Sequence, residues 1–491
     1  MTRIESDLEG NRVAELEAVL EILTKKLVDY AKAGNDPRGN IGPRHSPKEL
    51  DAKLNLSLPA EGQGLEGLIK DADQLLENSV VTWNAGFLDK LYASTNPVGI
   101  ASDMLLSILN TNSHVFTVSP AMTLIENKVG HEYAKLFGFT DRHSGGLTFP
   151  GGSYSNFTSV TIARSMLYPE TKEEGNFKKL ALFASNHCHY SVEKAAIFCG
   201  MGSKSLFKVK VNKAGQMLVE DLEAQIKRSI ELGYTPFYIN STAGTTVYGS
   251  FDDFNAIADI AAKYKMWLHV DGSWGGNVVF SQKQRVKLNG VERANSITVN
   301  PHKMLGVPTT CSFLLVPDKR ILQTANSLNA PYLFHNRDDS QEELYDLADG
   351  TMGCGRRPDA VKLYMGWRWY GTEGYGKRID HAFALAEYFA RKVNDAKDFV
   401  LVSELPPPCL QICFFYAPGG KLNDNADANS QLTREIVEEL HRRQRFLVDF
   451  APDADGRGEF FRVVVNSPVV TSETIDALME EIESIGKKLR G

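Results

Sequence analysis

The chain has 491 residues, of which 43% are hydrophobic and 23% charged, a composition typical of a globular enzyme and not of a disordered or fibrous protein. Its formal net charge is −7, with acidic and basic residues interspersed, so no basic stripe is available to neutralise phosphates and nucleic acid is excluded as a partner. Charges interrupt every apolar stretch of residues 1–34, and we therefore expect a cytoplasmic protein that does not bind membranes. The 6 cysteines include no CxxC pair, which favours reduced thiols over disulfides.

The N-terminal part is predicted to be a helix followed by a wrapping segment. Apolar residues recur at helical spacing from Val13 to Leu27, with Glu and Lys on the opposite face. Residues 35–48 are rich in Pro, Gly, Asn and Arg, which is typical of a linker.

The middle of the chain has the alternating strands and helices of an α/β domain. Helical patterns such as Val219–Leu232 separate short apolar runs, which predicts a doubly wound, mostly parallel sheet. The predicted strands are Leu180–Ala184, Pro236–Asn240, Trp267–Val270, Ser296–Val299 and Ser312–Val316.

A smaller α+β domain is predicted after Pro358. A long helical stretch runs to about residue 396, and short strands near 411–416 and 460–465 precede a closing helix from Ser472. We therefore expect three segments: a helical, wrapping segment (1–83), a large domain (84–365) and a small C-terminal domain (366–491).

Two residues at strand ends indicate covalent cofactor chemistry. Lys303 directly follows the strand Ser296–Val299, at the sheet edge where open α/β folds bind ligands, and a desolvated amine there can form a Schiff base. Asp271 ends the preceding strand, and its carboxylate could keep a pyridine nitrogen protonated. Taken alone, Lys303 could be a surface residue and Asp271 a helix cap.

A glycine-rich segment, Pro150–Asn156, leads into a predicted helix. Its glycines allow backbone N–H groups to approach a phosphate, and the helix dipole favours the negative charge. The segment fits neither GxxxxGK[ST] nor GxGxxG, which disfavours a nucleoside triphosphate or a dinucleotide.

Two histidines, His187 and His189, follow the strand Leu180–Ala184. With His269 or His302 they could form a metal centre, as in a zinc hydrolase. The sequence contains no HExxH motif or neighbouring carboxylate pattern, so an aromatic ring lying flat against a planar cofactor is favoured and no metal is expected.

Five motifs occur in the order found in group II pyridoxal-phosphate decarboxylases, which the chain resembles from about Asn84 to its C-terminus. Within that group it is most similar to glutamate decarboxylase and to the relatives that act on cysteine sulfinate and aspartate. The motifs are Pro150–Gly152, His187–Ser191, Ser241–Gly249, His269–Asp271 and Asn300–Lys303.

This resemblance implies a fold type I pyridoxal-phosphate enzyme, similar to aspartate aminotransferase, and assigns roles to individual residues. Lys303 would carry the cofactor as a Schiff base, Asp271 would pair with its ring nitrogen, and His189 would stack on the ring. Tyr332, on a predicted mobile loop, would protonate Cα after carbon dioxide leaves. The remaining cofactor contacts would come from Gly151, Gly152, Ser153, Thr245 and His302.

The substrate residues implied by the resemblance point to an acidic amino acid. Arg462 matches the arginine that binds the substrate carboxylate, a task suited to a planar guanidinium. Three positions depart from the animal glutamate decarboxylase pattern: Lys90 replaces a glutamine, His114 an aromatic residue, and Gly272-Ser273 a pair of alanines. Cations at Lys90 and Arg462 favour a distal acid, so glutamate, aspartate and cysteine sulfinate all remain possible substrates.

Three rival functions remain open at this stage. The same cofactor could serve an aminotransferase, a lyase or an oxidative deaminase, the histidines could belong to a zinc hydrolase, and the chain could be an inactive partner subunit. The shared active sites of the resembled family, together with the apolar face of the N-terminal helix, predict a homodimer with active sites at its interface.

Overall fold

The computed structural model of the protein describes residues 12–36, 38–328 and 345–490. By contact density the chain divides into two compact units. The large unit comprises Thr95–Phe414 with Val464–Asn466, and the small unit comprises the described residues before Thr95, Phe415–Val463 and the residues from Ser467 onward. The predicted segments 1–83, 84–365 and 366–491 remain a prediction, because contact density does not identify independently folding pieces.

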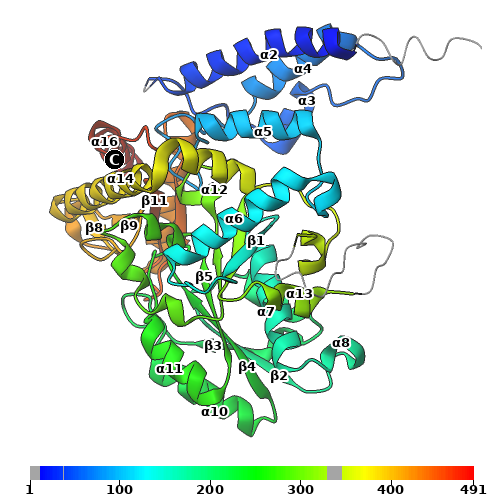
Figure 1. Ribbon diagram of the computed structural model, residues 1–491. Coiled ribbons are helices and arrows are strands. Elements are labelled where there is room, and N and C mark those ends of the chain that lie inside the picture. The colour runs from blue at the N-terminus through cyan, green and yellow to red at the C-terminus, as the bar shows by residue number, and fades with distance from the viewer. Residues whose placement is uncertain (1–11, 37, 329–344, 491) are drawn as a thin grey trace, which may run out of the picture. The chain divides into compact units, whose positions relative to one another are not determined.

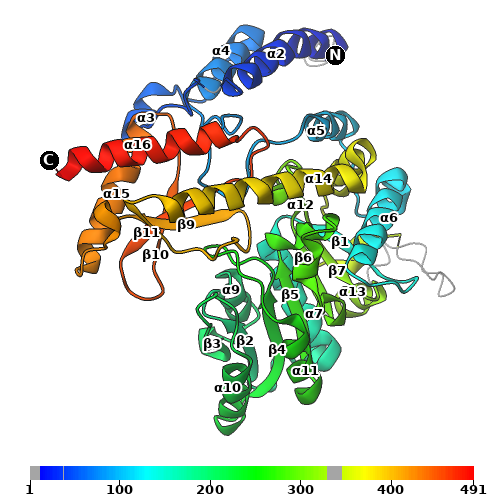
Figure 2. The ribbon, with the colours of Figure 1, turned by 90° about the vertical axis from the view of Figure 1, so that its left-hand side faces the viewer.

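The large unit is built on a seven-stranded sheet in the order β1-β7-β6-β5-β4-β2-β3 (Figures 1 and 2). The strands from β3 through β2, β4 and β5 to β6 run parallel, whereas β7 is antiparallel to both β6 and β1. The predicted, mostly parallel sheet is thus confirmed. The strands are β1 (Gly145–Phe149), β2 (Leu180–Ser185), β3 (Leu206–Val209), β4 (Thr235–Thr242), β5 (Trp267–Gly272), β6 (Ser296–Val299) and β7 (Ser312–Val316).

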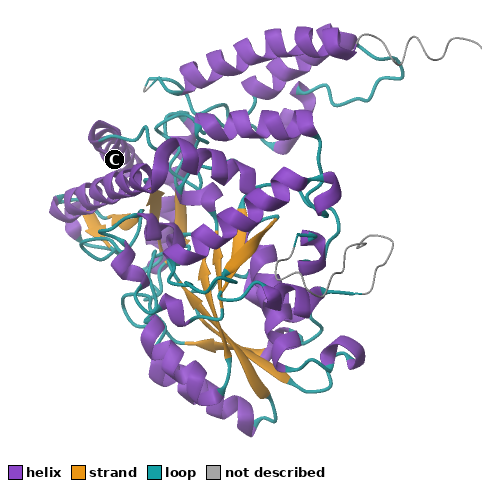
Figure 3. Ribbon diagram, viewed as in Figure 1, coloured by secondary structure: helices purple, strands orange, loops and turns teal. Residues whose placement is uncertain are grey.

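Helices surround this sheet: in Figure 3 its orange strands lie among purple helices. In Figure 2, α10 and α11 lie beside β4. Every residue of β1, β2, β5, β6 and β7 is buried, which explains why these strands read as continuous apolar runs. The helices of the large unit are α5 (Pro97–Leu109), α6 (Pro120–Leu136), α7 (Gly152–Leu167), α8 (Thr171–Glu174), α9 (Ser191–Phe198), α10 (Val219–Glu231), α11 (Phe254–Tyr264), α12 (Pro301–Met304), α13 (Arg320–Asn326) and α14 (Ala360–Asp395).

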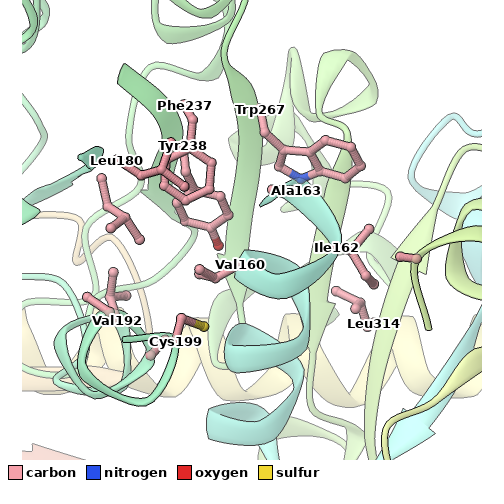
Figure 4. Packing of buried hydrophobic residues seen from close by; sticks show 14 of the residues in the cluster. Val160, Ile162, Ala163, Leu180, Val192, Cys199, Phe237, Tyr238, Trp267 and Leu314 are labelled. Atoms are coloured by element: carbon pink, nitrogen blue, oxygen red, sulfur yellow. The ribbon is translucent and has the colours of Figure 1, made fainter. Parts of the chain in front are cut away.

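Helix α7 packs its apolar face against the sheet (Figure 4). Val160 and Ile162 of α7 are at most 1% exposed and belong to one cluster with Leu180, Tyr238 and Leu314 from β2, β4 and β7. Burying such side chains contributes about 1.5–3 kcal/mol each. This packing fixes the N-terminus of α7 relative to the strand ends.

The sequence pattern missed strand β1, because its two leading glycines are typical of a turn. Strand β7 and helix α6 both approach Gly146 so closely that no side chain fits between them and its backbone. A Cβ on Gly146 would lie 2.2 Å from the Leu314 oxygen of β7, and a Cβ on Gly130 of α6 would lie 2.4 Å from the Gly146 oxygen. Close backbone approach therefore selects glycine here.

The small unit contains the N-terminal helices and most of the C-terminal α+β part. The predicted N-terminal helix is confirmed as α2, which packs beside α4 and is joined to it by the Lys26–Asp73 ion pair at 2.7 Å. Strand β10 pairs antiparallel with β11, and the C-terminal sheet has the order β10-β11-β9-β8. The bounds of its elements are α2 (Arg12–Gly34), α3 (Pro47–Lys53), α4 (Gly64–Glu77), α15 (Ala426–Arg442), β10 (Asp449–Pro452), β11 (Glu459–Val464) and α16 (Ser472–Arg490). Strand β8 (Phe399–Leu401) and residues 411–414 of β9 (Gln411–Tyr416) are assigned to the large unit. In the part of the chain that the structure describes, no helix is long and apolar enough to cross a membrane.

A buried ion pair holds β1 at the edge of the sheet. Glu126 of α6 is 0% exposed and accepts hydrogen bonds from the Arg356 guanidinium and from the Thr148 backbone N–H at 2.7 Å. The guanidinium also donates to the backbone oxygens of Thr148 and Ser113, both at 3.1 Å. A pair buried in this way is costly to break, because one charge is left without its partner.

We expect Arg356→Met to lower the free energy of unfolding by about 3–5 kcal/mol, since it strands the Glu126 carboxylate inside the protein. Denaturant unfolding followed by circular dichroism measures this. The control is Arg391→Met, which removes an exposed ion pair with Glu387 and should cost no more than about 1 kcal/mol. Equal losses for the two variants would contradict the structural role of the buried pair.

Candidate active site

Lys303 lies on the short helix α12, immediately after β6, which is the third of the seven strands across the sheet. Its side chain lines a cavity of about 220 Å³, and its backbone oxygen accepts a hydrogen bond from the Asn466 amide at 3.0 Å. Burial lowers the pKa of Lys303, although the charge of Asp271 opposes this shift. The cavity is lined by Gly152, Ser153, Asn156, His187, His189, Tyr190, Thr242, Gly244, Thr246, Asp271, Ser273, Trp274, Asn300, His302 and Lys303.

Asp271, at the end of β5, is 5% exposed and lines the same cavity. Its Oδ2 accepts from the Asn156 amide at 2.7 Å, and its Oδ1 accepts from the Ser273 backbone N–H at 3.0 Å. Burial alone would raise the pKa of Asp271, but His189, the Ser273 N–H and other neighbours outweigh burial and hold the pKa below its usual value. The carboxylate is therefore ionised inside the protein.

The glycine-rich segment forms the start of α7. Gly151 adopts φ 102°, a conformation that favours glycine, and no side chain caps the helix. A Cβ on Gly152 would lie 2.7 Å from both the Asn300 amide nitrogen and Ser273 Oγ. The first N–H groups of α7 thus face the cavity region without a side-chain cap, as an anion site requires.

His302 lies next to Lys303, with Nδ1 2.7 Å from the Cys311 oxygen. Burial lowers the pKa of His302 to about 4. The imidazole is therefore neutral near pH 7, and because the Cys311 oxygen can only accept, its one N–H lies on Nδ1 and Nε2 is left as an acceptor.

The two histidines that suggested a metal centre have separate contacts. His187 stacks on Tyr248, with ring centroids 4.9 Å apart. His189 accepts at Nδ1 from the Ser191 backbone N–H at 3.2 Å, and burial lowers its pKa. Over residues 12–36, 38–328 and 345–490, no group of three or more His, Cys, Asp or Glu residues could hold a metal ion.

Of the predicted cofactor residues, Gly151 and Thr245 are not among those that line the cavity. The Thr245 hydroxyl lies 2.8 Å from Ser250 Oγ, which ties the turn after β4 together. Thr246 and Gly244 line the cavity instead.

Sequence reasoning did not single out several cavity residues, among them Asn156, Trp274 and Asn300. Asn156 and Asn300 lie inside recognised motifs, and their polar side chains beside Gly152 and Lys303 were a usable signal. Trp274 donates from Nε1 to Gln411 Oε1 at 2.9 Å. Because these residues are far apart in the chain, no local sequence pattern indicates that Trp274 lies at the cavity.

The predicted substrate residues Lys90 and Arg462 belong to the small unit and form one cluster there. Arg462 is 7% exposed and donates to Asp449 Oδ2 at 2.9 Å and to the Asp89 backbone oxygen at 2.8 Å. Lys90 Nζ lies 2.9 Å from Asp89 Oδ1 and 3.1 Å from Asp449 Oδ2. Two cations are thus balanced by two carboxylates.

The other two predicted residues are not among those that line the cavity. His114 is half-buried in the large unit, with Nδ1 3.1 Å from the Asn112 oxygen. Tyr332 lies outside the described residues.

The cavity residues fit pyridoxal phosphate. Lys303 supplies an amine for an aldehyde, Asp271 an ionised carboxylate for a ring nitrogen, and the start of α7 a seat for a phosphate. Asn300 Oδ1 is buried in the cavity wall without a hydrogen-bond partner, which is costly unless a bound group supplies a donor.

Comparison with known proteins agrees with this geometry. The family model described as "Pyridoxal-dependent decarboxylase conserved domain" matches residues 47–417. The L-aspartate decarboxylase of Metarhizium robertsii is 43% identical over 498 residues, which covers 98% of each protein. A crystal structure of mouse CSAD has a TM-score of 0.90 at 33% identity and covers 97% of this chain and 99% of that chain.

A crystal structure of Oryza sativa TDC with PLP and tryptamine has a TM-score of 0.89 at 23% identity, covers the whole of both chains, and shares the fold. Since the family model covers well over half of the chain and a 43%-identical relative covers nearly all of it, the protein belongs to the pyridoxal-dependent decarboxylase family and has its fold type I, α/β architecture.

Proposed function

We propose that the protein removes the α-carboxylate of an acidic L-amino acid, with aspartate as the preferred substrate and β-alanine as the product. The observation that carries the chemistry is the buried Lys303 amine and the ionised Asp271 carboxylate lining one cavity. The acidic substrate is supported by the relatives: the 43%-identical protein is an L-aspartate decarboxylase. Glutamate and cysteine sulfinate are the alternatives to test beside aspartate.

Each cavity residue has a distinct task toward the cofactor. Bound pyridoxal phosphate supplies an electron sink for the pair left when carbon dioxide departs. Lys303 would hold its aldehyde carbon, and Asp271 would keep a proton at its ring nitrogen. His189 would cover the ring face, and the N–H groups at Gly152 and Ser153 would bind the phosphate beside neutral His302.

Proton transfer to Cα needs an acid, a role we assign to Tyr332 on the segment 329–344. A tyrosine hydroxyl can donate a proton as a general acid. Lys303 would be the residue that holds the cofactor between turnovers.

Substrate recognition is assigned to the cluster of Arg462 and Lys90. The Arg462 guanidinium suits a carboxylate by charge and by planar shape. Asp449 bridges both cations and so orients them, while it also offsets their charge. His114 and Ser273, the other departures, are proposed to tune the pocket.

The protein is further proposed to be a homodimer. Helix α5 exposes an apolar row, with Met104 at 44%, Ile108 at 60% and Leu109 at 47% exposure. Such a row is unfavourable in water and typical of a surface that a second copy covers.

A cytoplasmic location is proposed from the thiols. All six cysteines are free, and four of them are buried. Reduced cysteines are the rule in reducing compartments.

Borohydride reduction of the cofactor-loaded enzyme should attach the cofactor to Lys303, because it converts a Schiff base into a stable secondary amine. Peptide mapping identifies the residue. Lys303→Ala should retain less than about one hundredth of the activity, which is the scale of losing a catalytic proton-transfer group. Release of carbon dioxide and β-alanine in equal amounts, without a keto acid, excludes an aminotransferase and an oxidative deaminase. Attachment of the reduced cofactor to a lysine other than Lys303 would contradict the proposal.

Arg462→Met should raise the KM for aspartate by about 10- to 100-fold, since a charge-assisted hydrogen bond contributes about 1.5–3 kcal/mol. Steady-state kinetics with aspartate, glutamate, cysteine sulfinate and tyrosine measures this. Arg434→Met is the matched control, because Arg434 forms an exposed pair with Glu459 and should leave KM unchanged. Preferred turnover of tyrosine by the wild type would contradict the acidic substrate.

Ile108→Asp should convert the dimer to monomer, because a charge at the centre of the α5 row opposes its burial. Light scattering coupled to gel filtration measures the mass. Leu232→Asp changes another exposed residue, 55% exposed after α10, and should leave the dimer intact. A wild-type monomer with full activity would overturn the dimer.

A further inference from the structure

A continuous chain of buried hydrogen bonds ends at the Asp271 carboxylate. Trp267 Nε1 donates to Ser296 Oγ at 2.9 Å, and Ser296 Oγ lies 2.8 Å from His269 Nδ1. His269 Nε2 lies 3.1 Å from Asn156 Oδ1, and Asn156 Nδ2 donates to Asp271 Oδ2 at 2.7 Å. All five side chains are at most 7% exposed, so most of their hydrogen-bonding capacity is met by protein partners.

The Asp271 carboxylate at the end of this hydrogen-bond chain determines which group donates and which accepts in each bond. An ionised carboxylate only accepts, so Asn156 must turn its NH2 group toward Asp271 and its carbonyl toward His269. His269 Nε2 therefore carries a proton. Burial lowers the pKa of His269 to about 4, so the ring is neutral, and Nδ1 accepts from the Ser296 hydroxyl.

The same amide has a second branch. Asn156 Nδ2 also donates to Ser191 Oγ at 3.1 Å, and Ser191 contacts His189 Nδ1 through its hydroxyl at 2.8 Å and its backbone N–H at 3.2 Å. Because the Ser191 N–H can only donate, His189 Nδ1 is an acceptor and the ring proton lies on Nε2. One amide thus links the carboxylate with the ring that covers the cofactor.

We propose that Asn156 is a positioning residue that aligns the Asp271 carboxylate for the cofactor's ring nitrogen and fixes the neutral Nε2–H form of His189 and His269. This inference rests on the proposed function, because Asp271 and His189 are assigned there to the cofactor. A residue that merely filled the core would need no particular orientation of its amide. Asn156 needs a fixed orientation, since its NH2 group contacts an acceptor, Asp271, and its carbonyl oxygen contacts a donor, His269 Nε2.

The first experiment reads the proton positions directly in the wild-type enzyme. With ¹⁵N-labelled histidine, NMR should show His269 as the neutral Nε2–H form throughout the range from pH 6 to 8, with the signal assigned by its loss in His269→Gln. A proton on Nδ1 of His269, or a charged ring in this range, would overturn the inference. This measurement does not depend on how any Asn156 variant folds.

The second experiment replaces the donor by an acceptor of the same shape. In Asn156→Asp a carboxylate faces Asp271, so the two acids must share a proton, and the dissociation constant of pyridoxal 5′-phosphate should rise at least about tenfold. Asn156→Ala removes the donor without adding a charge and should have a smaller effect. Titration of the apoenzyme, followed by the cofactor's absorbance, gives the constants.

The matched control is Asn429→Asp in the small unit. Asn429 is 7% exposed and donates to two backbone oxygens at 2.9 and 2.8 Å, so its replacement should lower thermal stability without changing cofactor affinity. Wild-type affinity in Asn156→Asp would overturn the role of Asn156 alone. Failure of the wild type itself to bind pyridoxal 5′-phosphate would instead overturn the proposed function.

Discussion

The ionised carboxylate of Asp271 is the charge on which the rest of the site depends. Removing a carboxylate from water costs several kcal/mol unless hydrogen bonds and opposite charges replace the solvent. Here Asn156 and the Ser273 N–H donate to its two oxygens, and the charge of Lys303 contributes a favourable interaction. The same negative charge opposes the fall in the pKa of Lys303. The acid and the amine are therefore coupled before any cofactor enters.

The fold supplies this arrangement through the direction of its strands. Strands β4, β5 and β6 are parallel neighbours, so the turns that follow them meet at one edge of the sheet. The cavity is lined by Gly244 and Thr246 after β4, Ser273 after β5 and Lys303 after β6. Helix α7 enters at this edge without a side-chain cap. An amine, an acid and an anion seat thus converge from segments that lie far apart in the chain.

The substrate cluster follows a different electrostatic logic. Lys90 suggested a free cation for a distal acid, yet the structure pairs it with Asp89 and Asp449, and Asp449 also holds Arg462. A cluster whose positive and negative charges balance recognises an anion mainly through the orientation of its hydrogen-bond donors, and less through net charge. Selectivity among aspartate, glutamate and cysteine sulfinate would then depend on distances within the pocket.

Sequence alone determined the sheet-forming runs, the positions of Lys303 and Asp271 at strand ends, and the family, because these depend on local hydrophobic pattern and on motif order. Contacts between residues far apart in the sequence, which a local pattern does not encode, were visible only in the tertiary structure. Strand β1 was missed because Gly146 is selected by contact with β7 and α6, and the hydroxyl of Thr245 is bound by Ser250 rather than lining the cavity. The role of Asn156 was also hidden, since its amide acquires a direction only where α7, β5 and β6 meet. Hydrogen-bond partners distant in sequence leave no periodic signal, and only the folded chain brings them together.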